Sequence, residues 1–497
     1  MDLTTNIGIW VALVVIWIAA AMVTTRRMTR DHPLSDRPHP PVVSGFCLLN
    51  PLRVLLTKGV KAMIHEQHRA LGSVFTLSFF GVNMTFLVGP EVLDHFFQGP
   101  ESEISHCNVF EFMVPILGKG VGFGADIATR TEQMRFHNDA LKRPKIRNCI
   151  GAMLQEVEEY FAKWGQHGTV DLKHEMEQLV LLISSRCLLG KEIREKMLDE
   201  AHTLFRDLSG GMSLTSVLFP YAPTPTNRRR DAARAKLAKI FTEIVRSRRG
   251  RVQDQEEEED VLQNLIDSKY KDGRPTTEAE VTGLVIMLLF GANNTTSVTS
   301  TWTGACLLRH DHGRWLAAAA EEQRDIAARR RGGGGIDHGA LLEMDTLHRC
   351  VKEALRMHPV MPVFFRKVHR GFTLRTKDGA EYEIPGGHHL ASPALFNHRL
   401  PCIYSDPDVY DPDRFGPQRQ EDKVAGGGGR FAFTAFGGGR HSCVGEAYAY
   451  MQIKVIWSYL LRNFELELVS PFPDTDWSKL VPAPKGNVMV SYKRVAA

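Results

Sequence analysis

A glycine-rich segment near the C-terminus surrounds a single cysteine, Cys443, within residues 436–445 (FGGGRHSCVG), here called the cysteine loop. Glycines permit tight turns in which backbone N–H groups point at the sulfur, and such hydrogen bonds stabilise a thiolate and tune any metal that it binds. The chemistry would be that of a metal ligand, in the environment that a haem iron requires. The alternative is a glycine-rich hairpin with an incidental cysteine, since a free cysteine is often a small core residue.

Two charged motifs lie upstream of the cysteine loop. Glu353-Ala354-Leu355-Arg356 places a carboxylate and a guanidinium three residues apart, on one face of a predicted helix. Taken alone, such a pair is most often an exposed salt bridge worth less than about 1 kcal/mol. Residues 411–415 (DPDRF) lie between this pair and the loop and supply a second arginine, Arg414.

These three motifs, in this order, resemble those of the cytochrome P-450 superfamily, with His441 where most members carry an arginine. The resemblance implies a haem b whose iron binds the Cys443 thiolate. It also implies a mainly α fold with a smaller β region (α+β), forming one large catalytic domain. Arg414 would close a buried triad with Glu353 and Arg356. We interpret this triad as a scaffold under the haem, because removing one partner of a buried charged group is costly.

Composition agrees with a globular protein of this kind. The chain has 497 residues, of which 43% are hydrophobic and 24% charged, enough for one large domain or two ordinary ones. Its net charge of +4 is too small to indicate a nucleic-acid partner. The eight cysteines are scattered without CxxC spacing, which fits a reducing compartment with one ligand cysteine rather than a disulfide framework or a zinc site.

The N-terminus predicts a membrane anchor. Residues 7–23 form an uncharged apolar run that three arginines follow, and this order leaves the bulk of the protein on the cytosolic side. We therefore expect a single-pass anchor in the endoplasmic reticulum membrane over residues 1–30, a proline-rich linker over 31–50 and a cytosolic haem-thiolate catalytic domain over 51–497. A cleaved signal peptide is the alternative, although its basic residues would come first.

The residue patterns predict a hairpin and one long helix of special interest. Residues 74–80 and 85–88 flank a Gly-Val-Asn turn and predict a β-hairpin. Residues 278–309 predict a long apolar helix with small and polar residues near its middle. The simplest interpretation is a helix crossing whose polar side chains bond back to carbonyls. The resemblance instead implies a helix over the iron, whose small residues leave room for dioxygen while the Thr295 hydroxyl helps deliver protons.

The segment expected to deliver protons departs from the family pattern. The family's Gly-Gln-His-Thr is Ala292-Asn293-Asn294-Thr295 in this chain, so Asn294 replaces an ionisable histidine. An asparagine can order water but cannot change its charge near neutral pH. We expect water held by Asn294 and Thr295 to carry the protons.

Longer segments narrow the resemblance to the sterol 14-alpha-demethylases, which act on lanosterol or obtusifoliol. Residues 110–123 look like the substrate-recognition segment of that family, and the similarity spans nearly the whole chain after the anchor. It assigns Arg366 and His441 to the haem propionates. The family usually has tyrosines where this chain has phenylalanines at 110 and 123, so we expect Arg130 or Arg135 to supply a further donor. The residues expected to line an apolar sterol cavity are Phe110, Phe112, Met113, Leu117, Phe123, Phe290, Gly291, Met361, Val363, Phe365 and Leu480.

The resemblance implies an enzyme that removes the 14-alpha-methyl group of a sterol precursor by three successive oxygenations. Bulk at Phe112 predicts a preference for a 4-monomethyl sterol such as obtusifoliol over lanosterol. Each oxygenation needs dioxygen and two electrons, and the sequence contains no recognisable flavin or nicotinamide domain. A separate NADPH-dependent flavoprotein reductase is therefore implied, with Arg440 and Lys454 as candidate docking residues. Azole-type inhibitors are expected to ligate the haem iron.

Two other functions remain open at this point. A haem-thiolate isomerase or dehydratase acting on lipid hydroperoxides would share the fold but need neither oxygen nor a reductase. A membrane-anchored haem or sterol binder would catalyse no reaction. Thr295 and the sterol-type segment at 110–123 favour the demethylase over the first of these.

Overall fold

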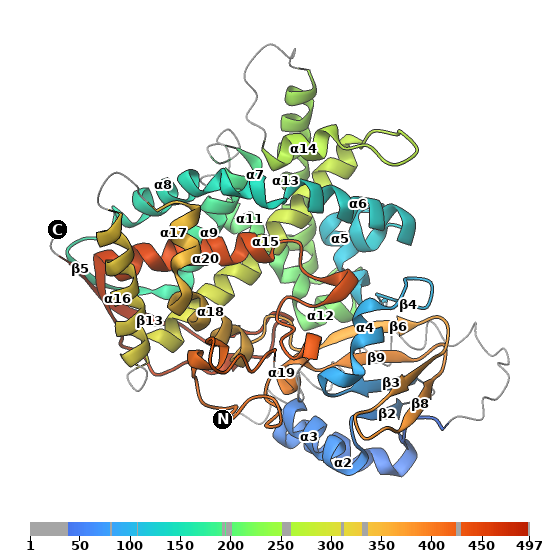
Figure 1. Cartoon of the computed structure of the whole chain (residues 1–497). Coiled ribbons are helices and arrows are strands. Elements are labelled where there is room, and N and C mark those ends of the chain that lie inside the picture. The colour runs from blue at the N-terminus through green and yellow to red at the C-terminus, as the bar shows by residue number, and fades with distance from the viewer. Residues whose placement is uncertain are drawn as a thin grey trace.

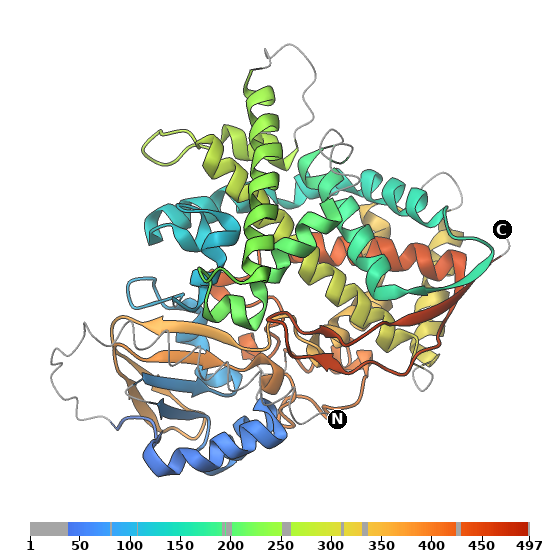
Figure 2. The same ribbon diagram turned by 180° about the vertical axis from the view of Figure 1, so that it is seen from behind.

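The computed structural model describes residues 38–495 apart from 80–81, 107, 191–193, 195–200, 251–259, 310–312, 331–335 and 424–428. The predicted membrane anchor over residues 1–30 lies outside the described residues. Figure 1 shows a large helical region beside a smaller β region, with helices α2 and α3 packed next to the sheet. Figure 2 shows from behind that the long helix α13 crosses the helical region.

Helices form where apolar residues recur at helical spacing, and α18 is one example, because its buried residues include Leu347, Val351 and Ala354. The helices are α2 (Leu49–Lys58), α3 (Val60–Leu71), α4 (Asp94–Gln98), α5 (Val114–Leu117), α6 (Ile127–Ala140), α7 (Arg143–Arg147), α8 (Cys149–Phe161), α9 (Leu172–Leu189), α11 (Ala201–Ser209), α12 (Leu214–Leu218), α13 (Pro225–Arg249), α14 (Val261–Asp267), α15 (Glu278–Leu307), α16 (Gly313–Arg329), α17 (His338–Glu343), α18 (Asp345–Met357), α19 (Ala394–Asn397) and α20 (Glu446–Asn463).

The strands gather mainly in the β region. They are β1 (Val42–Val43), β2 (Val74–Phe79), β3 (Val82–Leu87), β4 (Ile104–Ser105), β5 (His167–Asp171), β6 (Phe364–Val368), β7 (Phe372–Arg375), β8 (Glu381–Ile384), β9 (His389–Ser392), β10 (Phe464–Leu468), β11 (Thr475–Asp476), β12 (Ala483–Pro484) and β13 (Met489–Arg494). The largest sheet has the order β1-β2-β3-β9-β6-β4, and β10, β13 and β5 form a second sheet.

The predicted hairpin is confirmed, since β2 and β3 pair antiparallel from Val74 opposite Leu87 to Phe79 opposite Val82. The second strand begins earlier than predicted, at Val82. β1 comes from the predicted linker and pairs parallel with β2. The backbone N–H of Thr76 also donates to the carbonyl of Pro41 at 2.8 Å. The later part of the predicted linker therefore packs against the catalytic domain.

Helix α15 is a core helix that a capping box begins. The Thr277 side chain accepts from the N–H of Glu280, while the Glu280 carboxylate accepts from the N–H of Thr277. Among the described residues, α15 alone is long and apolar enough to cross a membrane, but 72% of its most apolar window is buried inside the protein. It packs against α9, α13 and α18. These contacts fix the position of the small and polar residues in its middle.

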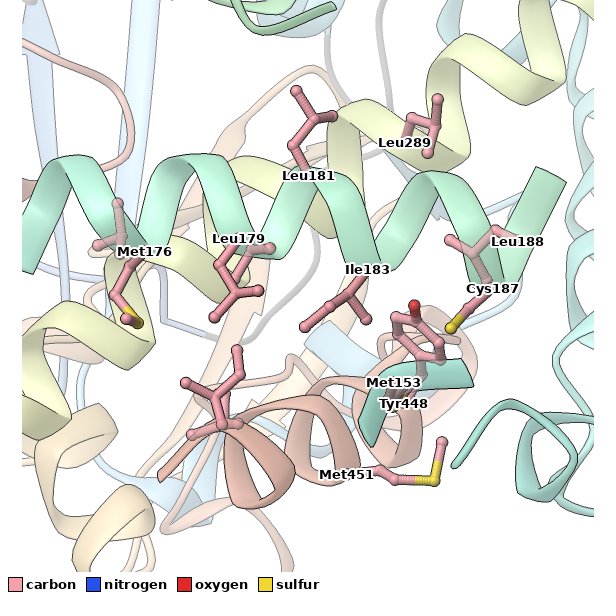
Figure 3. Close-up of a cluster of buried hydrophobic side chains, with 14 of the residues drawn as sticks. Met153, Met176, Leu179, Leu181, Ile183, Cys187, Leu188, Leu289, Tyr448 and Met451 are labelled. Atoms are coloured by element: carbon pink, nitrogen blue, oxygen red, sulfur yellow. The ribbon is translucent and has the colours of Figure 1, made fainter. Parts of the chain in front are cut away.

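Helix α20 begins directly after the cysteine loop and is fixed by contacts with α9 and α15. The Gln452 amide donates to the Val180 carbonyl of α9 at 3.1 Å, and the Trp457 indole donates to the Ser300 hydroxyl of α15 at 3.0 Å. Figure 3 shows the apolar side chains of this contact, with Ile183 of α9 directed toward the helix that carries Met451. These contacts hold α20 in the core, so the helix that follows Cys443 has a fixed position.

Candidate active site

The cysteine loop turns sharply just before α20. Gly437 and Gly439 have φ of +72° and +58°, in the left-handed region that favours glycine. The N–H of Cys443 donates to the Phe436 carbonyl at 2.8 Å, which closes the loop. Gly445 is the N-cap of α20, so the thiol lies at the N-terminal end of an 18-residue helix.

Backbone N–H groups at the start of α20 influence the thiol of Cys443. Its side chain is accessible to solvent, yet it lies deep enough for burial to raise the pKa of the thiol. Backbone N–H groups of Gly445 and Glu446 act in the opposite direction, because they favour the thiolate. A bound metal cation would complete the stabilisation, since a coordinating thiol is deprotonated.

The loop packs closely against α4. A Cβ at Gly439 would lie 2.2 Å from the Phe97 carbonyl oxygen, and one at Gly438 would lie 2.9 Å from the Phe431 ring. The rings of Phe97 and Phe431 stack at 4.9 Å. Glycine at 439 is therefore required both by its positive φ and by a backbone neighbour that cannot move aside as a side chain would.

Replacing Gly439 by alanine is expected to destabilise the protein more than the same change at Gly45. The two glycines have φ of +58° and +57°, but a Cβ at Gly45 meets nothing within 4 Å. Both variants lose about 1–2 kcal/mol to the left-handed backbone, and overpacking adds about 1–3 kcal/mol at Gly439 only. Urea denaturation measures the difference, and equal losses would show that the contact with Phe97 is unimportant.

Glu353, Arg356 and Arg414 come together in the interior, and each is at most 1% exposed along its side chain. Glu353 accepts from Arg356 Nε at 2.7 Å and from Arg414 Nε at 2.9 Å. Both arginines also donate to the carbonyl of Val409. The arrangement is a buried triad with its donors satisfied, in place of the exposed salt bridge that the Glu353–Arg356 spacing alone suggested.

Cationic and imidazole side chains gather beside the cysteine loop. Arg366 of β6 is 3% exposed, and its guanidinium lies 5.2 Å from the centre of the Phe96 ring. Glu101 pairs with His441 Nε2 at 3.1 Å and with Arg130 Nη2 at 3.4 Å. Burial and the charges of Arg366, Arg130 and Arg440 lower the pKa of His441 to about 3. The structure thus brings together three residues that the sequence analysis expected near the haem propionates: Arg366, Arg130 and His441. This group of side chains is called the niche below.

The structure places Arg130 near His441 and directs Arg135 to other partners. Arg135 pairs with Glu132 and Asp139 on its own helix and donates to the carbonyl of Lys269 at 2.8 Å. The positive charge of Arg130, by contrast, contributes to the lowered pKa of His441. His106 also belongs to this niche, with its ring centre 4.7 Å from that of His441. Sequence reasoning missed His106 because no motif contains it.

The middle of α15 combines open space with hydroxyl and amide groups. A Cβ at Gly291 would meet nothing within 4 Å. The Thr295 hydroxyl donates to the Gly291 carbonyl at 2.5 Å. The Asn294 amide donates to the Ser209 hydroxyl of α11 at 2.9 Å. Asn294 is thus held by a protein hydroxyl, a contact that the sequence did not suggest.

The predicted cavity residues fall into two groups. Phe112, Leu117 and Phe290 are buried in the apolar cluster around α15, and Phe110, Met113, Phe123 and Leu480 pack against that cluster. Val363 and Phe365 pack against the apolar cluster of the β region. Met361 is partly buried at the segment before β6. The rings of Phe110 and Phe123 stack at 4.7 Å.

Three features together are typical of a haem-thiolate protein: a cysteine thiol at the N-terminal end of a helix, a buried Glu-Arg-Arg triad and small residues in the middle of a central helix. A family model described as cytochrome P450 matches residues 38–490. The chain belongs to the cytochrome P450 family and, within it, to the sterol 14-demethylases. The predicted family and the mainly α fold with a smaller β region are both confirmed.

Curated relatives include sterol 14-demethylases from plants and from a mammal. The chain is 54% identical over 455 residues to obtusifoliol 14-alpha demethylase of Sorghum bicolor, covering 92% of this chain and 90% of that protein. It is 48% identical to sterol 14-demethylase of Arabidopsis thaliana, covering 99% and 97%. Lanosterol 14-alpha demethylase of Homo sapiens is 32% identical, covering 87% and 82%. The solved structure of retinoic acid-bound cyanobacterial CYP120A1 has a TM-score of 0.76 at 21% identity, covering 93% of this chain and 100% of that one, and shows the fold alone.

The residues of this chain fit a haem with cysteine thiolate on the iron. The Cys443 thiol has backbone donors that favour its anionic form. Arg130, Arg366 and His441 supply donors of the kind that carboxylates such as propionates bind. Gly291 of α15 leaves space where a side chain would otherwise intrude.

Proposed function

We propose that the protein removes the 14-alpha-methyl group of a sterol precursor, with a preference for the 4-monomethyl sterol obtusifoliol. One observation carries this proposal: backbone N–H groups favour the Cys443 thiolate in a chain that is 54% identical to an obtusifoliol 14-alpha demethylase. Three successive oxygenations convert the methyl group to alcohol, to aldehyde and finally to formate, and leave a 14,15 double bond. Each oxygenation consumes one dioxygen, two electrons and two protons.

Side chains of this protein hold the group that activates oxygen and supply its protons. When bound, the haem would supply the oxygen chemistry, and a cysteine thiolate on its iron would favour cleavage of the O–O bond. Burial raises the pKa of the Cys443 thiol, while the N–H groups of Gly445 and Glu446 favour the thiolate that a bound iron would stabilise. The Thr295 hydroxyl, held on the Gly291 carbonyl at 2.5 Å, passes protons with water ordered by Asn294. The contact between Asn294 and Ser209 fixes the amide that orders this water.

Electrons come from a separate NADPH-dependent flavoprotein reductase, which binds a basic surface near the cysteine loop. Arg440 is exposed there, with its Nε donating to the Gln98 carbonyl at 2.9 Å. Lys454 was wrongly predicted for this surface: it is 8% exposed and donates to the Leu341 carbonyl at 2.8 Å. The positive charge of Arg143 in α7 lowers the pKa of Glu446 against the effect of burial, so α7 lies near the start of α20 and makes Arg143 a second candidate for this surface.

We place the protein on the endoplasmic reticulum membrane through a single-pass anchor at residues 1–30, with the catalytic domain of residues 51–497 in the cytosol. The start of the described chain supports contact with lipid. Phe46 and Leu49 in the linker region 31–50 are 91% and 64% exposed, and exposed apolar side chains in one segment often mark an interaction surface.

Replacing Phe112 by leucine is expected to raise turnover of lanosterol relative to obtusifoliol. Phe112 is 2% exposed, and its ring lies 6.4 Å from that of Phe110, so shortening it makes room for a second methyl group at C4. One methyl group in an apolar pocket is worth about 1–3 kcal/mol, which corresponds to about a tenfold change or more in the ratio. Turnover of both sterols by wild type, Phe112→Leu and the remote Phe161→Leu measures it. An unchanged ratio in Phe112→Leu would contradict this role.

The function is tested with the full-length protein, the reductase and NADPH. The reduced protein should show the carbon monoxide band of a haem-thiolate, and an azole-type inhibitor should shift the haem spectrum by ligating the iron. Obtusifoliol should be demethylated faster than lanosterol. Turnover of a lipid hydroperoxide without reductase would instead identify the isomerase or dehydratase, and a haem-thiolate spectrum without any turnover would identify a binder.

A further inference from the structure

His106 directly follows β4 and lies among three aromatic rings. Its imidazole meets Phe110, Phe123 and His441 in T-shaped contacts, with ring centres 5.6, 5.4 and 4.7 Å apart. Ring contacts on several sides hold the imidazole in place. Nδ1 of His106 is buried and has no hydrogen-bond partner among the described residues. A buried polar atom without a hydrogen-bond partner costs folding free energy, so a bound ligand is expected to supply a partner for this nitrogen.

The surroundings of His106 select an anion over a cation. Ligand atoms of Glu101, His106 and His441 lie within 4.8 Å of one another, a spacing that a metal ion could also use. However, burial and the positive charges of Arg366 and Arg130 lower the pKa of His106 to about 2. Two guanidinium charges outweigh the single Glu101 carboxylate of the cluster, so the net field repels a metal cation and attracts a further carboxylate. A neutral His106 can then donate one N–H hydrogen bond.

We propose that His106 donates a hydrogen bond to a haem propionate and so helps to retain the haem. The inference rests on the proposed haem-thiolate function. The neighbouring rings of Phe110 and Phe123 carry no group that could make this bond, whereas Arg366, Arg130 and His441 supply the other donors of the same niche. Nothing in the spacing of the sequence motifs marks His106, and its role follows from its position among these groups.

The test measures how fast the full-length holoprotein loses haem to excess apomyoglobin, followed by the absorbance of the haem. His106→Phe keeps an aromatic ring and removes the donor, while His106→Asn keeps an N–H near the position of Nδ1. The matched control is His202→Phe, because His202 also makes a T-shaped contact with a second histidine, His174, at 5.7 Å. A hydrogen bond to a charged group is worth about tenfold or more in an equilibrium constant.

We expect His106→Phe to lose haem about tenfold faster than wild type, His106→Asn to fall between the two, and His202→Phe to match wild type. Haem loss from His106→Phe at the wild-type rate would overturn the proposal, and so would equal rates for the Phe and Asn variants, which would assign the effect to packing. If His106→Phe cannot be purified with haem, haemin affinity of the apoproteins gives the same comparison. A wild-type protein that holds haem but demethylates no sterol would contradict the proposed function while leaving the comparison valid.

Discussion

Cys443→Ala is expected to lose both the haem-thiolate carbon monoxide band and all measurable sterol turnover. No other side chain of the loop can replace the thiolate whose electron donation favours O–O cleavage. The backbone N–H groups of Gly445 and Glu446, which favour the anionic sulfur, would face a methyl group instead. Difference spectra of the reduced protein and a reductase-coupled assay measure the two losses.

Cys402→Ala is the matched control, since Cys402 is an exposed free cysteine. This variant should keep the spectrum and the turnover of the wild type. A haem-thiolate band that survives in Cys443→Ala would assign the iron ligand to another residue. It would also remove the chemical basis of the proposed oxygenation.

Glu353→Gln is expected to destabilise the protein by about 3–5 kcal/mol, a large share of the total stability of a typical domain. Glu353 Oε1 accepts from Arg356 Nη2, Arg414 Nε and the N–H of Asp411, each at 2.9 Å. The neutral amide cannot balance two buried guanidinium groups, and its NH₂ cannot accept their hydrogen bonds. Urea denaturation of the variant gives the loss in the free energy of unfolding.

Glu343→Gln serves as the control for this substitution. Glu343 also pairs with two arginines, Arg329 and Arg330, but its side chain is 41% exposed. Solvent screens such pairs, so stability should be nearly unchanged. If Glu353→Gln were no more harmful than Glu343→Gln, the triad would not be the structural support that its burial indicates.

The sequence predicted the elements whose residues form local or fixed motifs. The hairpin at β2 and β3 follows from alternation and a short turn, and α15 follows from a long apolar pattern. The spacing of Glu353 and Arg356 fixed their shared helix face. Their burial with Arg414 depends on a segment 61 residues away from Glu353, and only the fold brings it there.

Features that depend on side-chain direction were harder to predict. Arg130 and Arg135 lie on the same helix, and the orientation of α6 in the fold determines which of the two arginines faces His441. Lys454 looked like a surface charge, yet it is buried, and burial lowers its pKa to about 8. The contact between Asn294 and Ser209 joins residues 85 positions apart, which no local pattern reveals.

The most direct test of the account follows the fate of the methyl carbon. Obtusifoliol labelled at the 14-alpha-methyl carbon is incubated with the full-length protein, the flavoprotein reductase, NADPH and dioxygen. We expect labelled formate to appear in step with the sterol that carries the 14,15 double bond, and only when the reductase is present. Absence of labelled formate from a protein that shows the haem-thiolate band would contradict the proposed demethylation.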